Sequence, residues 1–361
     1  MRTDRVLGLR QVKKLVFLGC TIMTMALAVG EVLSADDKAQ RMEAGGWEQG
    51  VPRKTTRTPL HQAIENDNVD LALTYVKEER WINDRDVFGL TPMHFAVIKE
   101  NLVLVGALLA AHARVSLADS RGDTPLHMVA AHQGSSDVAK LLLDGGAEVN
   151  QANLQGSTPL HWAAGEGNLA LVDLFLAHKA NVDAADDKGE TPLHWAVDSL
   201  RVGVVKVLLR AGADPGKLNL SGRSPLHLAA KNGQMEIAAL LVDRGVDLGV
   251  KGVSGDTPLH WAAGQGHVNV VKYLSQRSKE IDPRAKFGET PLHWAAFNGR
   301  YDVAAWLIAS GADCNVMDAM GKTPLQLAQA KGHDHVVKLL LPRSTVNTVD
   351  RGVRSKSSPK I

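Results

Sequence analysis

The sequence is poor in cysteine, because Cys20 and Cys314 are the only two among 361 residues. Two thiols do not suffice for the set of disulfides that stabilises many small extracellular domains, so a disulfide framework is excluded. Aromatic residues are also scarce, at 4% of the chain. Few large rings are therefore available to fill the core of a conventional globular domain.

The charge of the chain is nearly balanced, with a formal net charge of +2. This balance gives no general attraction to nucleic acid or to an anionic membrane. The sequence also lacks a nucleophile near a plausible base, a carboxylate pair placed to share a cleft, and cysteines at zinc-binding spacing. We therefore expect no catalytic residue, no metal, no cofactor and no nucleic-acid partner.

The first 35 residues differ from the rest of the chain. Five basic residues precede an apolar run from Leu15 to Gly30, and small residues follow up to Ala35. This order is typical of a secretory signal peptide, and an apolar run of about 16 residues is shorter than the roughly 20 that span a bilayer. We predict that residues 1–35 are removed and that the protein is secreted or periplasmic. The alternatives are an uncleaved membrane anchor over residues 15–35 and a cytosolic protein.

A short motif, Thr-Pro-Leu-His, recurs with small variations along most of the chain. It contains nine of the fourteen prolines, and successive copies are 33 residues apart, except for one spacing of 34. Self-similarity with a fixed period of this length indicates a solenoid of stacked units. The copies start at Thr58, Thr91, Thr124, Thr158, Thr191, Ser224, Thr257, Thr290 and Thr323.

The residues of the motif predict the local structure of each unit, as the copy at Thr257 illustrates. Thr257 is a favourable helix N-cap, and Pro258 fits the first helical turn, where its missing N–H has no intrahelical partner to lose. Gly266 ends this short helix, and a second helix begins near His267. A hairpin-like loop with a turn glycine then leads to the next motif. One unit alone buries little apolar surface, so the units must stack.

The unit from Gly255 to Ala263, which reads Gly-Asp-Thr-Pro-Leu-His-Trp-Ala-Ala, closely resembles the consensus of the ankyrin repeat. The resemblance implies an all-α ankyrin-repeat solenoid of helix-turn-helix units with hairpin-like loops. It covers residues 55–342, in which we predict nine repeats. Residues 36–54 are then a linker, and the polar residues 343–361 a disordered tail.

Several units lack an expected glycine. The replacements fall either between the two helices or after the second one: Asp67, Glu79, Glu100, His112, Lys179, Leu200 and Ser278. The single extra residue of the long spacing lies within residues 131–135. The first and ninth units depart most from the pattern, as expected for the ends of a stack, which face water.

Eight of the units carry the motif histidine. Histidines on stacked helices about 8–10 Å apart do not converge on one zinc ion, whose bonds to nitrogen are about 2 Å long. The resemblance implies instead that these histidines hydrogen-bond the loops and tie adjacent units together. They are His61, His94, His127, His161, His194, His227, His260 and His293.

Four motif histidines are followed by a tryptophan, at Trp162, Trp195, Trp261 and Trp294. We interpret these rings as apolar filler along the first helices. The alternative is an aromatic cage for a methylated lysine, held by cation–π attraction. Cys314 occupies a position that is apolar in other units, and we expect it to be a small buried hydrophobic residue.

Ankyrin domains, as the resemblance implies, bind other proteins through the loop tips and the concave surface of the first helices. We therefore predict a monomeric protein–protein interaction scaffold; a membrane-tethered adaptor and an enzyme with a degenerate site are the alternatives. Exposed phenylalanines on this surface would suit an interface. The predicted partner-binding residues are Phe88, Leu90, Arg121, Asp123, Lys188, Glu190, Arg223, Lys231, Phe287, Glu289 and Phe297.

Cleavage after Ala35 would remove five basic and two acidic residues, which changes the net charge from +2 to −1. We expect protein purified from its native host to begin near Asp36, because small residues precede that position as they do at signal-peptidase sites. Intact-mass spectrometry checks this. A mass that still includes Met1 to Ala35 would contradict the cleaved signal and favour the membrane anchor.

Overall fold

The computed structural model describes residues 57–132 and 134–343, and its helices are labelled α3 to α20. Over these residues the chain forms eighteen α-helices and one final 3-10 helix, and none of them lies in a β-strand. The predicted signal peptide and linker, and the tail beyond Arg343, lie outside the described residues. The all-α prediction is confirmed.

The helices form consecutive pairs, each with a first helix that carries the motif and a second helix that follows it. Their bounds are α3 Pro59–Glu65, α4 Val69–Lys77, α5 Pro92–Ile98, α6 Leu102–Ala110, α7 Pro125–Ala131, α8 Ser136–Asp144, α9 Pro159–Glu166, α10 Leu169–Ala177, α11 Pro192–Asp198, α12 Val202–Arg210, α13 Pro225–Lys231, α14 Met235–Val242, α15 Pro258–Gln265, α16 Val268–Arg277, α17 Pro291–Phe297, α18 Tyr301–Ala309, α19 Pro324–Lys331 and α20 Asp334–Leu340.

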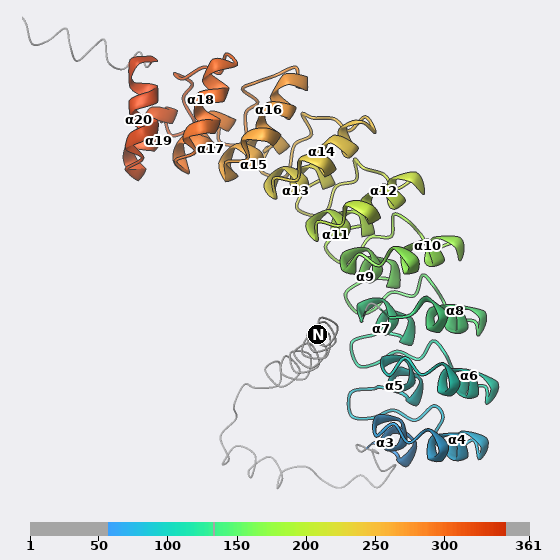
Figure 1. Ribbon diagram of the computed structural model, residues 1–361. Helices are drawn as coiled ribbons and strands as arrows, with labels where there is room; N and C mark the ends of the chain where they lie inside the picture. The colour runs from blue at the N-terminus through green and yellow to red at the C-terminus, as the bar shows by residue number, and fades with distance from the viewer. Residues whose placement is uncertain (1–56, 133, 344–361) are drawn as a thin grey trace, which may run out of the picture. The chain divides into compact units, whose positions relative to one another are not determined.

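Successive pairs stack in chain order. First helices pack against neighbouring first helices, and second helices against neighbouring second helices, so the two kinds lie on opposite sides of the stack (Figure 1). Contacts beyond the pair are therefore made with the next pair along the chain, as a solenoid requires. Over the described residues, no helix is both apolar enough and long enough to span a bilayer.

The start of each first helix follows from the motif. In every copy the proline is the first helical residue, and the preceding threonine or serine is in extended conformation as the N-cap. The side chain three residues later returns to the cap; in the copy at Thr257, the cap N–H donates to Nδ1 of His260 at 3.1 Å. This capping box normally uses glutamate or glutamine, and here histidine supplies the acceptor.

The core is built from leucine, valine and alanine, which explains how a chain poor in aromatic residues fills it. In the pair α9–α10, Leu160, Ala163, Ala164 and Leu171 are fully buried, and Phe175 is the one large ring among them. The alanines allow neighbouring first helices to approach closely. Cys314 belongs to the same core and is 7% exposed, as predicted, and burial raises the pKa of its thiol.

Most of the glycine replacements take up the left-handed backbone that glycine adopts in the other units. Six of them have φ between 52° and 65°: Asp67, Glu79, Glu100, His112, Lys179 and Leu200. Ser278 is different, with φ −72° and ψ 146°. Helix α16 runs on to Arg277, and the chain leaves it in extended conformation, so no left-handed residue is needed there.

Leu200 offers a test of this strain, because its side chain is 59% exposed and its φ is 62°. A non-glycine residue in left-handed conformation destabilises the fold by about 1–2 kcal/mol. Replacement by glycine removes this strain, but part of the gain is offset because glycine has a larger conformational entropy in the unfolded chain. We expect Leu200→Gly to raise the free energy of unfolding by about 1 kcal/mol. Chemical denaturation measures it.

Leu200→Ala is the matched control, because it removes most of the side chain but keeps a Cβ on the left-handed backbone. We expect it to be less stable than Leu200→Gly by about 1 kcal/mol. Equal stability of the two variants would show that the backbone at Leu200 is not strained.

Candidate protein-binding surface

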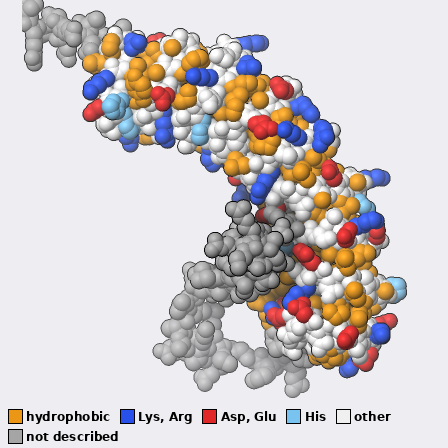
Figure 2. Space-filling view, in the orientation of Figure 1, with side chains coloured by type: hydrophobic (Ala, Val, Ile, Leu, Met, Phe, Trp, Pro, Cys, Tyr) orange, Lys and Arg blue, Asp and Glu red, His pale blue; other side chains and the backbone are white. Residues whose placement is uncertain are grey.

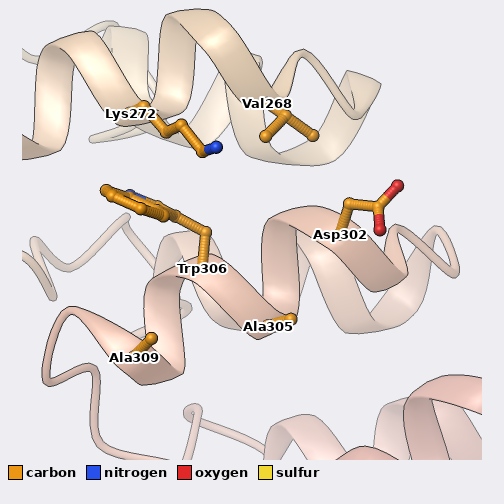
Figure 3. A pocket seen from close by; sticks show the side chains of 6 residues that line it. All are labelled: Val268, Lys272, Asp302, Ala305, Trp306 and Ala309. Carbon is orange, nitrogen blue, oxygen red and sulfur yellow. The ribbon is translucent and has the colours of Figure 1, made fainter.

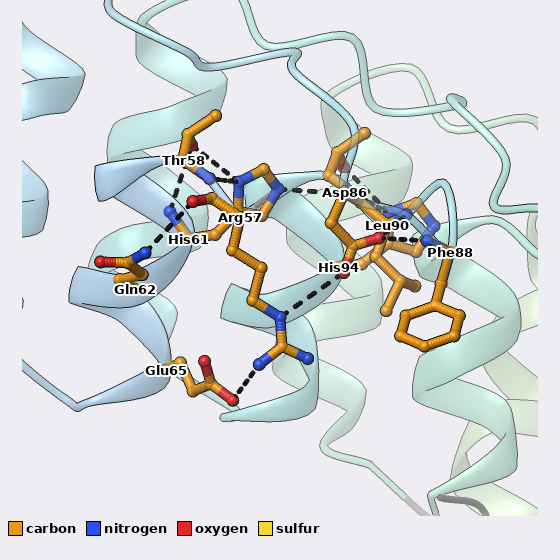
Figure 4. Close-up of polar contacts among 10 residues, drawn as sticks. Arg57, Thr58, His61, Gln62, Glu65, Asp86, Phe88, Leu90 and His94 are labelled. Carbon is orange, nitrogen blue, oxygen red and sulfur yellow. Dashed lines mark hydrogen bonds and ion pairs between the residues drawn. The ribbon is translucent and has the colours of Figure 1, made fainter. Parts of the chain in front are cut away.

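The motif histidines join each unit to the next one. In the first unit, Nδ1 of His61 accepts from the N–H of Thr58, so Nε2 carries the proton and donates to the carbonyl of Leu90 at 3.1 Å (Figure 4). The same pair of bonds recurs at the other seven motif histidines, with Nε2 to carbonyl distances of 3.0–3.2 Å. Both ring nitrogens are thus engaged within the stack. The predicted role of these histidines is confirmed.

These histidines are neutral because they are buried. Desolvation lowers the pKa of all eight below the usual 6.5, and to about 4 for His94 and His260. The two hydrogen bonds also require a neutral ring that is protonated on Nε2, because Nδ1 must accept a hydrogen bond while Nε2 donates one.

Each hairpin-like loop ends in a five-residue tip with a turn glycine at its fourth position. In the tip 119–123, the N–H of Asp119 donates to the carbonyl of Asp123 at 2.8 Å, and the N–H of Gly122 donates to the carbonyl of Asp119 at 3.1 Å. The eight loop tips are residues 86–90, 119–123, 153–157, 186–190, 219–223, 252–256, 285–289 and 318–322.

Neighbouring loop tips are linked by one backbone hydrogen bond each. The carbonyl of Phe88 accepts from the N–H of Ser120 at 2.8 Å, and the series continues to the last tip, where the carbonyl of Phe287 accepts from Ala319 at 2.7 Å. At Gly122, φ is 82° and a Cβ would lie 2.6 Å from the nitrogen of Leu154, so only glycine fits. The tips therefore form a continuous ridge with fixed spacing.

Six of the eight loop tips present an exposed apolar side chain. Leu154, Leu220, Val253 and Met320 are 70–80% exposed, and Phe287 is 59% exposed. Val87 and Phe88 share the first tip. Apolar side chains are interspersed with acidic and basic ones over the face seen in Figure 2. The sequence signal for Val253, which the prediction missed, is an apolar residue two positions before a turn glycine.

The predicted partner-binding residues fall into three groups by exposure. Phe88, Lys188, Phe287 and Phe297 are exposed, and Arg121, Glu190, Arg223, Lys231 and Glu289 are half-buried. Most of them lie on the ridge of loop tips, whereas Lys231 and Phe297 end the first helices α13 and α17. Leu90 and Asp123 are buried, at 8% and 3% exposure.

Leu90 and Asp123 are therefore wrong as partner-contact residues. Each directly precedes a motif threonine, at the point where the loop enters the core. Leu90 packs in the core, and its carbonyl accepts from His61. The Asp123 carboxylate accepts from Nδ2 of Asn153 at 2.7 Å and pairs with Nη2 of Arg121 at 3.1 Å. Its charge is used to hold two neighbouring tips together.

The tryptophans pair across adjacent first helices. The ring centroids of Trp162 and Trp195 are 6.0 Å apart, and those of Trp261 and Trp294 are 5.6 Å apart. The guanidinium of Arg223 lies 4.7 Å from the ring centroid of Trp261. A cation of the protein itself thus occupies the position that a methylated lysine would take over Trp261, which argues against an aromatic cage at that pair.

A shallow hollow lies on the opposite side of the stack, between α16 and α18 (Figure 3). The ring of Trp306 lines it, with Nζ of Lys272 4.8 Å from the ring centroid. The indole N–H donates to Oγ of Ser275 at 3.1 Å. Trp306 is therefore fixed by the neighbouring second helix.

Comparison with known families agrees with this geometry. The family model described as ankyrin repeats (three copies) matches residues 60–153, 128–219, 203–286 and 278–350. The chain belongs to the ankyrin-repeat family. Ankyrin repeats mediate binding to other proteins, and the proteins that contain them are generally non-enzymatic scaffolds. None of the curated proteins matches the chain.

The buried histidines of the ankyrin repeats predict sensitivity to acid. Because folding lowers their pKa, the unfolded chain binds more protons than the folded chain below pH 6.5. Stability is therefore complete above about pH 6.5 and falls as the pH decreases toward 4. A single histidine with a folded pKa of about 4 accounts for a loss of about 3 kcal/mol by pH 4. Chemical denaturation at several pH values measures this loss.

His94→Gln tests the assignment, since Gln326 already takes the histidine position in the ninth repeat and accepts from the N–H of Thr323 at 3.0 Å. We expect this variant to show a shallower fall in stability between pH 6.5 and pH 4, by about one proton. The unmodified chain, measured at the same pH values, provides the comparison. An unchanged slope in His94→Gln would refute the assignment.

Proposed function

We propose that this protein is a secreted or periplasmic scaffold that binds another protein through its ridge of loop tips and the adjoining ends of its first helices. The observation that carries the proposal is the row of exposed apolar side chains on the loop tips. A soluble monomer rarely exposes an organised series of large apolar side chains without using it. Interfaces, in contrast, favour such anchors within a polar surround.

The rigidity of the ridge supports the same function. The backbone bond between neighbouring tips and the histidine bond beneath it hold every tip at a fixed distance from the next one. A partner that fits the ridge therefore orders few protein groups on binding, which reduces the entropic cost of association. The proposed location outside the cytoplasm is supported by the basic and apolar pattern of residues 1–35.

The double variant Phe88→Asp with Phe287→Asp tests this proposal, since both rings are exposed and lie far apart along the ridge. We expect it to capture the protein partner from the native host at least about tenfold less well, because two apolar anchors become charged. Quantitative mass spectrometry of co-purified protein measures capture. Far-UV circular dichroism should show an unchanged helical fold.

Val103 provides the matched control, because it is 61% exposed but lies on the second helix α6. Val103→Asp should leave capture unchanged. Equal capture by the double variant and the unmodified protein would refute binding through the loop tips. Equal loss in the control would show that the second-helix side contributes as much.

A further inference from the structure

A groove of about 540 Å³ opens between two neighbouring loop tips, 219–223 and 252–256. Leu220 and Val253 form its outer edges, and the rings of Trp261 and Trp294 line it from the first helices α15 and α17. It is thus part of the ridge proposed above as the partner-binding surface.

The groove lies beside one of the two loop tips that depart from the repeated pattern; the other tip, 285–289, begins with Ala285. Six tips begin with an aspartate or asparagine whose side chain accepts from the backbone N–H groups two and four residues later: Asp86, Asp119, Asn153, Asp186, Asn219 and Asp318. The tip 252–256 begins with Gly252 instead. The carboxylate of Asp256 takes that space, since a Cβ on Gly252 would lie 3.0 Å from its Oδ1.

The Asp256 carboxylate is buried and hydrogen-bonded in the wall of the groove and does not face its opening. Its Oδ2 accepts from Nε1 of Trp261, and the residue is only 5% exposed. This bond fixes the indole of Trp261, and the guanidinium carbon of Arg223 lies over that ring, 4.7 Å from its centroid. The Arg223 guanidinium therefore lines the groove and is supported by the ring of Trp261.

Arg223 makes no ion pair with a described residue, unlike two comparable arginines of the stack. Arg57 also precedes a motif threonine and lies over the next ring, that of Phe95 at 5.0 Å, but it pairs with Glu65 and Asp86 (Figure 4). Arg121, on another loop tip, pairs with two aspartates. Within residues 57–132 and 134–343, no carboxylate lies within ion-pair distance of the Arg223 guanidinium.

We infer that this groove binds a peptide segment of the partner that carries an aspartate or glutamate beside an apolar side chain. The carboxylate pairs with the Arg223 guanidinium, whose planar array of N–H donors suits bidentate contact. The apolar side chain packs on Trp294 between Leu220 and Val253. The inference rests on the proposed function and names the chemistry of the ligand at this part of the ridge.

The charge of Arg223 selects among possible occupants. A cationic side chain would be repelled by the guanidinium across the narrow groove. A wholly apolar segment would cover the guanidinium without supplying a counter-charge, which is unfavourable for a desolvated ion. A peptide with one carboxylate next to one apolar group can pair with the guanidinium and also pack on the apolar side chains of the groove.

The test selects a library of random linear peptides on the full chain and measures the affinity of the enriched peptides by fluorescence polarisation. We expect the enriched peptides to share an acidic residue next to an apolar one. Arg223→Gln should weaken their binding at least about tenfold, the usual effect of losing a hydrogen-bonded charge. Added salt should weaken binding to the unmodified chain more than to the variant.

Two further variants keep the result interpretable. Arg223→Lys retains the charge without the planar donors, and we expect it to bind more tightly than Arg223→Gln. Arg57→Gln removes an arginine that stacks in the same way but is already paired, and we expect it to leave peptide affinity unchanged. The melting temperatures of the two Arg223 variants should match that of the unmodified chain within a few degrees, because Arg223 is half-buried at the surface.

The inference would be overturned if no peptide were enriched or if the enriched peptides lacked acidic residues. It would also be overturned if the peptides bound Arg223→Gln and the unmodified chain with equal affinity. These results separate it from the proposed function, which is tested by capture of the native partner. If Phe88→Asp with Phe287→Asp abolishes capture and Arg223→Gln does not, the ridge binds the partner and the groove does not. If neither variant affects capture, the proposed function fails as well.

Discussion

The structure depends on one repeated hydrogen bond, from Nε2 of a motif histidine to the backbone carbonyl that precedes the next motif. The donor histidine is buried in all eight units, and the acceptor residue is buried in four of them, so a unit without its neighbour would leave a buried donor unsatisfied. The same imidazole caps its own helix through Nδ1. Local helix initiation and contact between units are therefore coupled in a single side chain.

The fixed spacing of the loop tips is a consequence of this coupling. Because each histidine holds the base of the next loop, the tips are close enough to share a backbone hydrogen bond. Some tip side chains add to this order, since the aspartate or asparagine that begins six of the tips accepts from the tip backbone. The exposed apolar row from Phe88 to Met320 is the part of the ridge that we propose for recognition.

The features specific to this chain lie where its residues depart from the repeated pattern. Leu200 and five other residues hold left-handed backbone at positions where glycine would be easier, which is a local strain that stacking overcomes. Gly252 does the opposite, because it removes an acceptor from a loop tip and lets Asp256 occupy the space. The groove beside Arg223 lies at the site of that exchange.

The sequence by itself determined the period, the helix caps, the turn glycines and the all-α class, because each depends on residues within a few positions of one another. Thr257 followed by Pro258 predicts a helix start wherever it stands. Only the tertiary structure decided which residues near a loop tip reach solvent. Leu90 and Arg223 both precede a motif threonine or serine, yet Leu90 turns into the core and Arg223 lies over a ring of the next unit. That choice depends on side chains about one repeat away, which periodicity alone does not place.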